Sequence, residues 1–320
     1  MGPVGLSAVR ARAVEDAERA QRSVSERAAR KGEEAPPYVL VELIGKGSYG
    51  RVYKGEDTRT REVVAVKIID IDESDTANPR LADTYSEFLK EITALKVLSE
   101  GKAKNINHII DALPVGQTMW MVTEHCGGGS VATLMRPKPG GLEEKYIIPI
   151  LREVAEALGW VHRAGIIHRD VKSLSPSLLP PARLPWLLLY LLIHSLAPSI
   201  APSIAPSIAP SIAPSIAPSP PLPNHFPRHP NTPQPGANIL LTTAGSVQLC
   251  DFGVAGTLSA TTDKRSTFIG TPHWMAPELF STTTASDAST LSYGAEVDIW
   301  AFGAVVYEVA TGLPPNSSTR

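Results

Sequence analysis

The sequence predicts an α+β protein of two lobes, with strands in the first lobe and helices in the second. Between residues 38 and 70, β-branched residues form short runs around a glycine-rich turn, a pattern typical of strands. At residues 84–99 and 146–162 the apolar side chains instead recur every three or four positions, as in amphipathic helices. Strands followed by helices favour an α+β arrangement over alternating βαβ units.

Composition argues against several classes of protein. The 320 residues carry a net charge of −2, so there is no electrostatic case for binding nucleic acid. The longest apolar run, 186–193, is far shorter than the roughly 20 residues of a bilayer span, and the first 31 residues lack the apolar core of a signal peptide. Two cysteines, Cys126 and Cys250, suggest a reducing compartment rather than a disulfide framework, and hence a cytoplasmic location.

The first 37 residues are a charged, alanine-rich extension. This composition is compatible with a helix or with a disordered lead-in, and we expect a solvated segment in either case. Pro36 and Pro37 mark its boundary with the first lobe.

Four strands are expected in the first lobe. Val39, Val41 and Leu43 recur at every second position, and Arg51–Lys54 and Val63–Ile69 are further β-branched runs. Another short strand is expected at 119–122.

Helices are expected in three places. The spacing of Phe88, Ile92, Leu95 and the pair Val97–Leu98 predicts one apolar face of a helix over residues 84–99. A second amphipathic helix is expected at 146–162. The segment Val297–Val309 is apolar nearly all round, which predicts a helix buried on every side.

A glycine-rich turn, Gly45–Gly50, lies between two predicted strands. A turn of this kind can fold over a triphosphate with its backbone N–H groups facing the oxygens. Dinucleotide-binding folds use a similar glycine pattern, but there a helix follows the turn. Lys67, on the next strand among apolar residues, must either extend its ammonium group to solvent or find an anion. In the functional interpretation it holds phosphates and pairs with Glu91 on the following helix.

Two acidic motifs complete the set. They are His168-Arg-Asp170 and Asp251-Phe-Gly253, and phosphoryl transfer needs two such carboxylates, one for the nucleophile's hydroxyl and one for magnesium. Asp170 and Asp251 fit these two roles. With the later segment Thr271–Glu278 (TPHWMAPE), the chain resembles the eukaryotic protein kinases, and in particular the germinal-centre branch of the sterile-twenty-like Ser/Thr group.

The resemblance covers residues 38–172 and 236–312 and implies a bilobal protein-kinase fold that transfers phosphate from ATP, with Mg²⁺, to protein Ser/Thr residues. It implies protein substrates and an adaptor or upstream kinase as partners. Lys172 is typical of Ser/Thr kinases, and Asn238 matches a second magnesium ligand. In the activation segment, the resemblance matches Thr267 to the residue that becomes phosphorylated, and Arg169 would bind that phosphate. It matches Thr271 to a threonine that contacts Asp170, and Glu278 to a glutamate that pairs with an arginine. The nucleotide-binding positions so implied are Gly45, Lys46, Gly47, Ser48, Gly50, Val52, Ala65, Lys67, Thr123 as the residue that gates the pocket, Glu124, Cys126 and Leu240.

Residues 173–235 differ in kind from the rest. They hold 17 of the 29 prolines, only two charged residues and five consecutive Ser-Ile-Ala-Pro repeats, so we expect disordered or polyproline-like chain. Asn238 follows Asp170 by 68 positions, whereas the family has five, and removing these 63 residues restores five. The break in composition coincides with the break in the motif, which indicates a retained intron or an error in the gene model.

The expected organisation is therefore an extension at 1–37, an N-lobe with hinge at 38–126, a first part of the C-lobe at 127–172, the insert at 173–235, and the rest of the C-lobe at 236–320. The C-lobe is expected to be incomplete, because only a few residues follow its apolar helix. Three interpretations stay open. The chain is a Ser/Thr kinase, or an impaired product that binds ATP or serves as a scaffold, or, on the weakest evidence, a protein tethered to a membrane through 186–193.

Overall fold

A five-stranded antiparallel sheet forms the first lobe of the computed structural model, which describes residues 3–47, 50–70, 79–136, 140–173, 237–257, 271–279 and 293–315. The strands, in the spatial order β1-β2-β3-β5-β4, are β1 (Tyr38–Gly47), β2 (Gly50–Asp57), β3 (Val63–Asp70), β4 (Ile109–Val115) and β5 (Thr118–Glu124). All the expected strands are confirmed. β4 was not expected, because Asp111 and Pro114 interrupt its apolar pattern.

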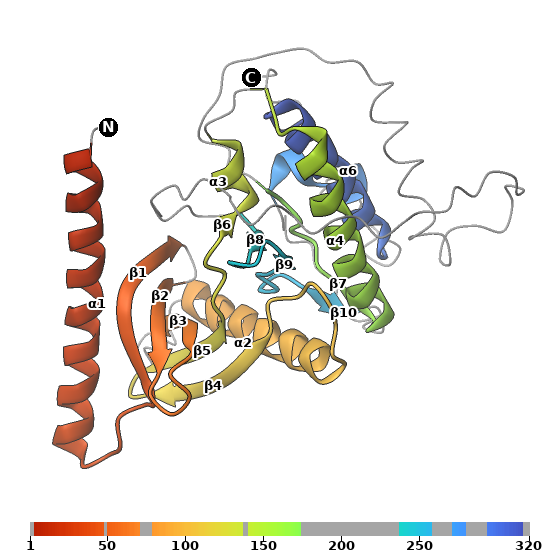
Figure 1. The fold of residues 1–320 in the computed structure, drawn as a ribbon. Helices are drawn as coiled ribbons and strands as arrows, with labels where there is room; N and C mark the ends of the chain where they lie inside the picture. The colour runs from red at the N-terminus through yellow and green to blue at the C-terminus, as the bar shows by residue number, and fades with distance from the viewer. Residues whose placement is uncertain are drawn as a thin grey trace, which may run out of the picture.

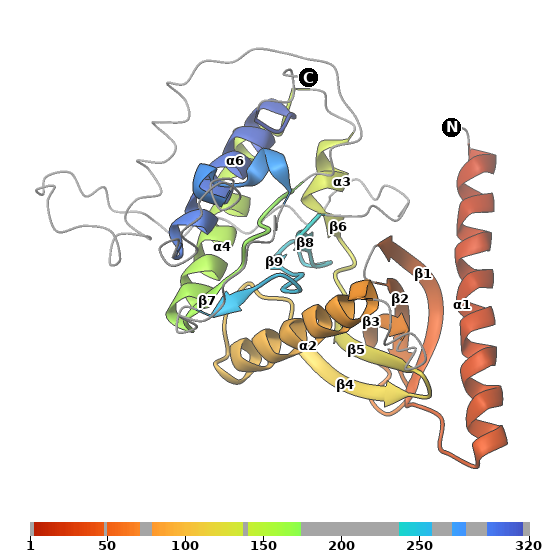
Figure 2. The ribbon, with the colours of Figure 1, turned by 180° about the vertical axis from the view of Figure 1, so that it is seen from behind.

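Two long helices cover the two faces of this sheet (Figures 1 and 2). Helix α2 (Pro79–Glu100) lies between the sheet and the second lobe, and its buried residues Phe88, Ile92, Leu95 and Leu98 confirm the predicted apolar face. The prediction that Val97 lies on that face is wrong, since its side chain is 45% exposed. Two positions after Leu95 is a rotation of roughly 200° about the helix axis, which turns Val97 to the opposite side.

Helix α1 (Pro3–Lys31) packs along the outer face of the sheet (Figure 1). We expected a solvated segment here, but Ala17 is fully buried in a cluster with residues of the sheet. The apolar alternation in β1 also differs from the expectation. Tyr38 and Leu40 are the buried residues, whereas Val39 and Val41 are about two-fifths exposed. Tyr38 and Leu40 are buried because they pack in one apolar cluster with Ala17 of α1.

The second lobe is built on α4 (Glu144–Arg163) and α6 (Glu296–Thr311), which pack side by side (Figure 2). Both predicted helices are confirmed. The prediction that α6 is buried on every side is wrong, because Trp300 is 53% exposed. The short elements of this lobe are β6 (Gly129–Ser130), α3 (Val131–Met135), β7 (Ile166–Ile167), β8 (Ile239–Leu241), β9 (Val247–Leu249), β10 (Gly256–Thr257), η3 (Pro272–Trp274) and η4 (Pro277–Leu279).

Within the described ranges, no helix combines the length and the apolar character that crossing a bilayer requires. The apolar run at 186–193 and almost all of the proline-rich block lie outside the described residues.

Candidate active site

The glycine-rich turn is held between two paired strands. The pairing of β1 with β2 continues to the tip of the turn, where Gly47 faces Gly50. At Gly50 φ is +118°, and a Cβ atom there would lie 2.2 Å from the carbonyl oxygen of Ile68, so the position requires glycine. Strands on both sides agree with a loop that covers phosphates and not with a dinucleotide site. Ser48 lies outside the described residues.

Lys67 and Glu91 form the expected ion pair. The Nζ atom of Lys67, on β3, lies 2.6 Å from Oε2 of Glu91, on α2, and Glu91 is only 3% exposed. The Oδ1 atom of Asp251 is 3.8 Å from the same ammonium group. Burial lowers the pKa of Lys67, but the nearby carboxylates more than offset this and hold the pKa above its ordinary value. The ammonium group therefore stays charged at neutral pH, as the binding of phosphate oxygens requires.

Asp170 is surrounded by three hydrogen-bond donors. Lys172 donates from Nζ to Oδ2 at 2.5 Å, and Thr271 donates from Oγ1 to Oδ1 at 3.0 Å. Asn238 donates from Nδ2 to the Asp170 backbone oxygen at 2.7 Å and to Oδ2 at 3.0 Å. Lys172 also donates to Thr271 at 2.8 Å, so residues from three distant segments meet at one carboxylate.

Asn238 and Asp251 come from adjacent segments beside this carboxylate. The backbone N–H of Cys250, directly before Asp251, donates to the backbone oxygen of Asn238 at 3.0 Å. The side-chain nitrogen of Asn238 donates to Asp170, so the side-chain oxygen of Asn238 is left as an acceptor. A carboxylate and an amide oxygen suit Mg²⁺, which takes one or two protein ligands together with substrate phosphates. No group of three or more His, Cys, Asp or Glu side chains that could hold a metal ion occurs among the described residues.

The segment His168–Lys172, which contains Asp170, is anchored by Asp298, a residue not predicted to have a role. This side chain on α6 is fully buried and accepts hydrogen bonds from the backbone N–H groups of His168 at 2.8 Å and Arg169 at 2.7 Å. The Nε2 atom of His162 lies 2.8 Å from the same carboxylate. A carboxylate within a largely apolar helix was the signal available in the sequence, because a buried carboxylate needs donors. Arg169 has a φ of +68°, a strained value that these bonds help to hold.

We therefore expect Asp298→Ala to lower the free energy of unfolding by about 3 kcal/mol or more, since two buried N–H groups lose their acceptor. Asp70→Ala, at an exposed position of β3, is the matched control and should change stability little. Urea unfolding followed by circular dichroism measures both. Equal midpoints for the two variants would contradict the anchoring role.

The segment after β5 is held by a buried amide. Asn107 donates from Nδ2 to the backbone oxygen of Glu124 and to the Gln248 side chain, both at 2.9 Å, and Gln248 donates to the Glu124 carboxylate at 2.6 Å. Sequence reasoning missed Asn107 and Gln248, since nothing local distinguishes them from surface amides. The remaining expected nucleotide positions are placed as follows: Gly45 and Lys46 on β1, Val52 on β2, Ala65 on β3, Thr123 at the end of β5, Cys126 just after it, and Leu240 on β8.

The arginine next to Asp170 is largely buried. Arg169 donates from Nε to the Val254 backbone oxygen at 2.6 Å and from Nη1 to the Tyr293 hydroxyl at 2.9 Å. Its Nη2 atom has no hydrogen-bond partner among the described residues. Thr267, which the resemblance pairs with this arginine, lies outside them, and Glu278 lies half-buried in η4.

Ser173, the first residue of the proline-rich block, is part of the folded lobe. Its side chain is fully buried and donates to Oε2 of Glu308, the oxygen that also accepts from Nε1 of Trp274 at 2.9 Å. On the far side of the block, the backbone N–H of Asn238 donates to the Lys172 backbone oxygen at 3.1 Å. The two arms of the interrupted loop therefore lie next to each other.

We expect both cysteines to be poor nucleophiles at neutral pH. Burial raises the pKa of Cys126 to about 12 and that of Cys250 well above its ordinary value. We expect slow alkylation by iodoacetamide at pH 7.5, with a rate that rises about tenfold per pH unit below these pKa values, because only the thiolate reacts. Mass spectrometry of labelled peptides measures this, with the urea-unfolded chain as control. Fast labelling of the folded chain at pH 7.5 would contradict the burial of the thiols.

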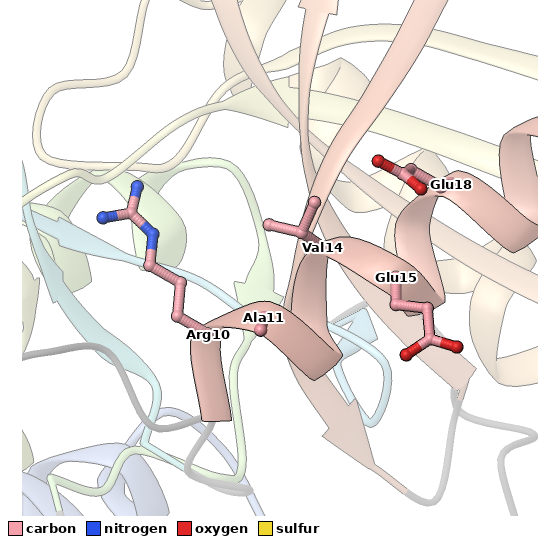
Figure 3. Close-up of a pocket in the computed structure, with 5 residues that line it drawn as sticks. All are labelled: Arg10, Ala11, Val14, Glu15 and Glu18. Atoms are coloured by element: carbon pink, nitrogen blue, oxygen red, sulfur yellow. The ribbon is translucent and has the colours of Figure 1, made fainter. Parts of the chain in front are cut away.

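A hollow of about 410 Å³ on the surface is separate from this site. Figure 3 shows that its lining comes from one side of α1, with Arg10 and Glu15 pointing away from each other on either side of Val14. It contains none of the residues described above, and we assign no ligand to it.

Comparison with known proteins follows the same division of the chain. The sequence pattern of the family described as the protein kinase domain matches residues 38–174 and 236–320. The chain is 34% identical over 283 residues to Serine/threonine-protein kinase 1 of Arabidopsis thaliana, covering 88% of this chain and 24% of the relative. It is 31% identical over 283 residues to Misshapen-like kinase 1 of Rattus norvegicus, covering 87% of this chain and 16% of the relative. It is 30% identical over 285 residues to Serine/threonine-protein kinase sid1 of Schizosaccharomyces pombe, covering 89% of this chain and 43% of the relative.

Proposed function

The chain belongs to the protein kinase family, and on that premise we propose that it transfers the γ-phosphate of ATP to serine and threonine side chains of proteins. The observation that carries the proposal is the environment of Asp170, whose carboxylate is held by Lys172, Thr271 and Asn238. The ammonium group of Lys172 and the hydroxyl group of Thr271 hold the carboxylate in place. They form a polar environment suited to a substrate hydroxyl next to a phosphate.

In the proposed reaction, Asp170 orients the substrate hydroxyl and accepts its proton. Lys172 lies within hydrogen-bond reach of Asp170 and offsets negative charge that develops on the transferred group. Lys67, kept charged beside Glu91, binds the α- and β-phosphates. Asp251 and Asn238 would hold Mg²⁺, which neutralises charge on the phosphates when it is bound.

The nucleotide would lie under the glycine-rich turn, with the adenine at Glu124–Cys126 behind the gating residue Thr123. Phosphorylation of Thr267 would add a charge of about −2, which the free Nη2 donor of Arg169 is suited to meet. Glu278 would pair with an arginine.

Substrates and partners belong to the whole protein, and the chain spans only a quarter or less of the Arabidopsis and rat relatives. We propose protein substrates, an upstream kinase or adaptor as partner, and a cytoplasmic location, the last from the two free cysteines.

A second candidate function is that of an impaired product that binds ATP without transferring phosphate. The observation that favours it is the length of chain between Lys172 and Asn238, the two arms of the catalytic loop. All the side chains expected for catalysis are nevertheless present.

One experiment separates the two candidates. The full chain, and a form without residues 173–235, are incubated with Mg²⁺, γ-labelled ATP and a generic basic protein. Label on phosphoserine and phosphothreonine is expected for the shortened form. Nucleotide binding without transfer by the full chain, beside transfer by the shortened form, would favour the second candidate. Nucleotide binding without transfer by the shortened form, or no nucleotide binding by either form, would overturn the proposal.

A further inference from the structure

Helix α1 lies against the strand that carries the glycine-rich turn. Of the elements in the sheet, β1 is the one that α1 contacts most (Figure 1). The helix presents a stripe of small residues, of which Ala17 is fully buried and Ala28 is 9% exposed, with Ala20 and Val24 packed beside them. Alanines allow a close approach, and the stripe covers Leu40 of β1.

Polar contacts fix the helix to β1 at two points. The backbone N–H of Leu40 donates to Oε1 of Gln21 at 3.0 Å. Nearer the turn, Nε of Arg10 lies 3.7 Å from Oε1 of Glu42, three residues before Gly45. The Arg10 side chain is 75% exposed, so this pair contributes little, and the anchor lies in the apolar stripe and the Gln21 bond.

A third contact lies at the other end of the helix. The guanidinium of Arg27 covers the turn between β4 and β5, where a Cβ atom on Gly116 would lie 2.4 Å from its Nη1 atom. The helix therefore links this turn to β1. Because β1 is an edge strand, only β2 pairs with it, and α1 supplies the remaining restraint.

We propose that α1 is a positioning element for the glycine-rich turn, with Ala17 and Gln21 as its positioning residues. The inference rests on the proposed function, because it assigns the turn to nucleotide phosphates. A loop aligned before its ligand arrives loses less conformational entropy on binding, so docking of α1 strengthens the binding of nucleotide. Linkage requires the reverse effect as well, and nucleotide therefore strengthens docking of α1.

The test compares two alanines of the same helix in the full chain. Ala17→Glu places a carboxylate in the buried stripe, whereas Ala29→Glu makes the same change at an exposed position. Binding of a fluorescent, non-hydrolysable ATP analogue with Mg²⁺ is measured by titration. We expect Ala17→Glu to raise Kd roughly fivefold or more and Ala29→Glu to leave it unchanged.

A milder pair guards against loss of folding. Gln21→Met removes the acceptor for Leu40, and Gln21→Glu keeps one, so we expect a raised Kd for the first and a near-normal Kd for the second. The reciprocal effect is read in the unaltered chain, where the analogue should slow tryptic cleavage within α1. A helix that is not coupled to nucleotide binding would show no difference in Kd between the two Gln21 variants, and the analogue would slow cleavage within α1 no more than cleavage elsewhere in the chain.

The possible failures are distinguishable. Equal Kd values for Ala17→Glu and Ala29→Glu, or for the two Gln21 variants if Ala17→Glu does not fold, would overturn this inference alone. Absence of nucleotide binding by the unaltered chain would overturn the proposed function and the inference together.

Discussion

Replacing Asp170 by asparagine is expected to lower kcat by about 10²- to 10⁴-fold, because the amide cannot accept the proton of the substrate hydroxyl. The substitution keeps the shape of the side chain. It also keeps an acceptor for Lys172 or Thr271, which both donate to the carboxylate in the structure. Binding of nucleotide should change little, since no phosphate contact is assigned to Asp170. The expected pattern is thus a loss in kcat with a nearly constant Kd for the ATP analogue.

The measurement is steady-state transfer of labelled phosphate by the form without residues 173–235, beside titration with the analogue. Asp70→Asn, at an exposed position of β3, is the matched control. A fall in kcat of less than tenfold would contradict the assignment of Asp170 as the base. A parallel loss of nucleotide binding would indicate that the substitution disturbs the site as a whole.

Removal of residues 173–235 is expected to raise the transfer rate by roughly 10- to 100-fold. Lengthening the connection between Asp170 and Asn238 from 5 to 68 residues is nearly four doublings, which adds about 2 kcal/mol of closure entropy. The contacts of Asn238 with Asp170 must form against this cost, so the assembled loop is populated less often. The structure shows that the arms of the loop can meet, since the Asn238 N–H reaches the Lys172 backbone oxygen. Removing the block should therefore close the loop without strain.

Two deletions of equal length sharpen this test. Removal of 173–235 leaves Gly236 between Lys172 and Ala237, whereas removal of 174–236 leaves Ser173 there. Ser173 donates to the buried carboxylate of Glu308, and glycine offers no donor. We expect the form with Ser173 to be more stable by about 1 kcal/mol, because the buried oxygen of Glu308 keeps the hydrogen bond from Ser173 beside the one from Trp274.

Rates of phosphate transfer and thermal unfolding midpoints are compared for the full chain and both deletions. Similar rates with and without the block would contradict the expected impairment. Sequencing the transcript across the codons for Lys172 and Gly236 shows independently whether the block is removed before translation, and in which of the two ways.

Much of the candidate site was predictable because its motifs are short and chemically specific. A lysine on an apolar strand and a glutamate on the next helix predicted the ion pair of Lys67 and Glu91, which the structure brings to 2.6 Å. The glycines predicted a turn between two strands, and the structure has β1 paired with β2 up to Gly47 and Gly50. In each case the residue type needs a partner, and the spacing leaves few candidates.

Other parts were not predictable because their partners are remote in the sequence. Asp298 holds the backbone of His168 from 130 positions away, and Asn107 meets Gln248 across 141. No local pattern indicates such a meeting. For β4, Asp111 and Pro114 hide a strand whose edge position tolerates them.

The sequence by itself determined the two-lobed α+β class, the protein kinase family and the bounds of the proline-rich block, since these depend on periodicity, motif chemistry and composition. Only the tertiary structure decided that α1 covers the sheet instead of lying in solvent, and that Ser173 belongs to the core of the second lobe. The physical reason is the same for both. An alanine stripe or a single serine is compatible with water or with a buried surface, and the choice depends on whether another part of the chain offers a complementary face.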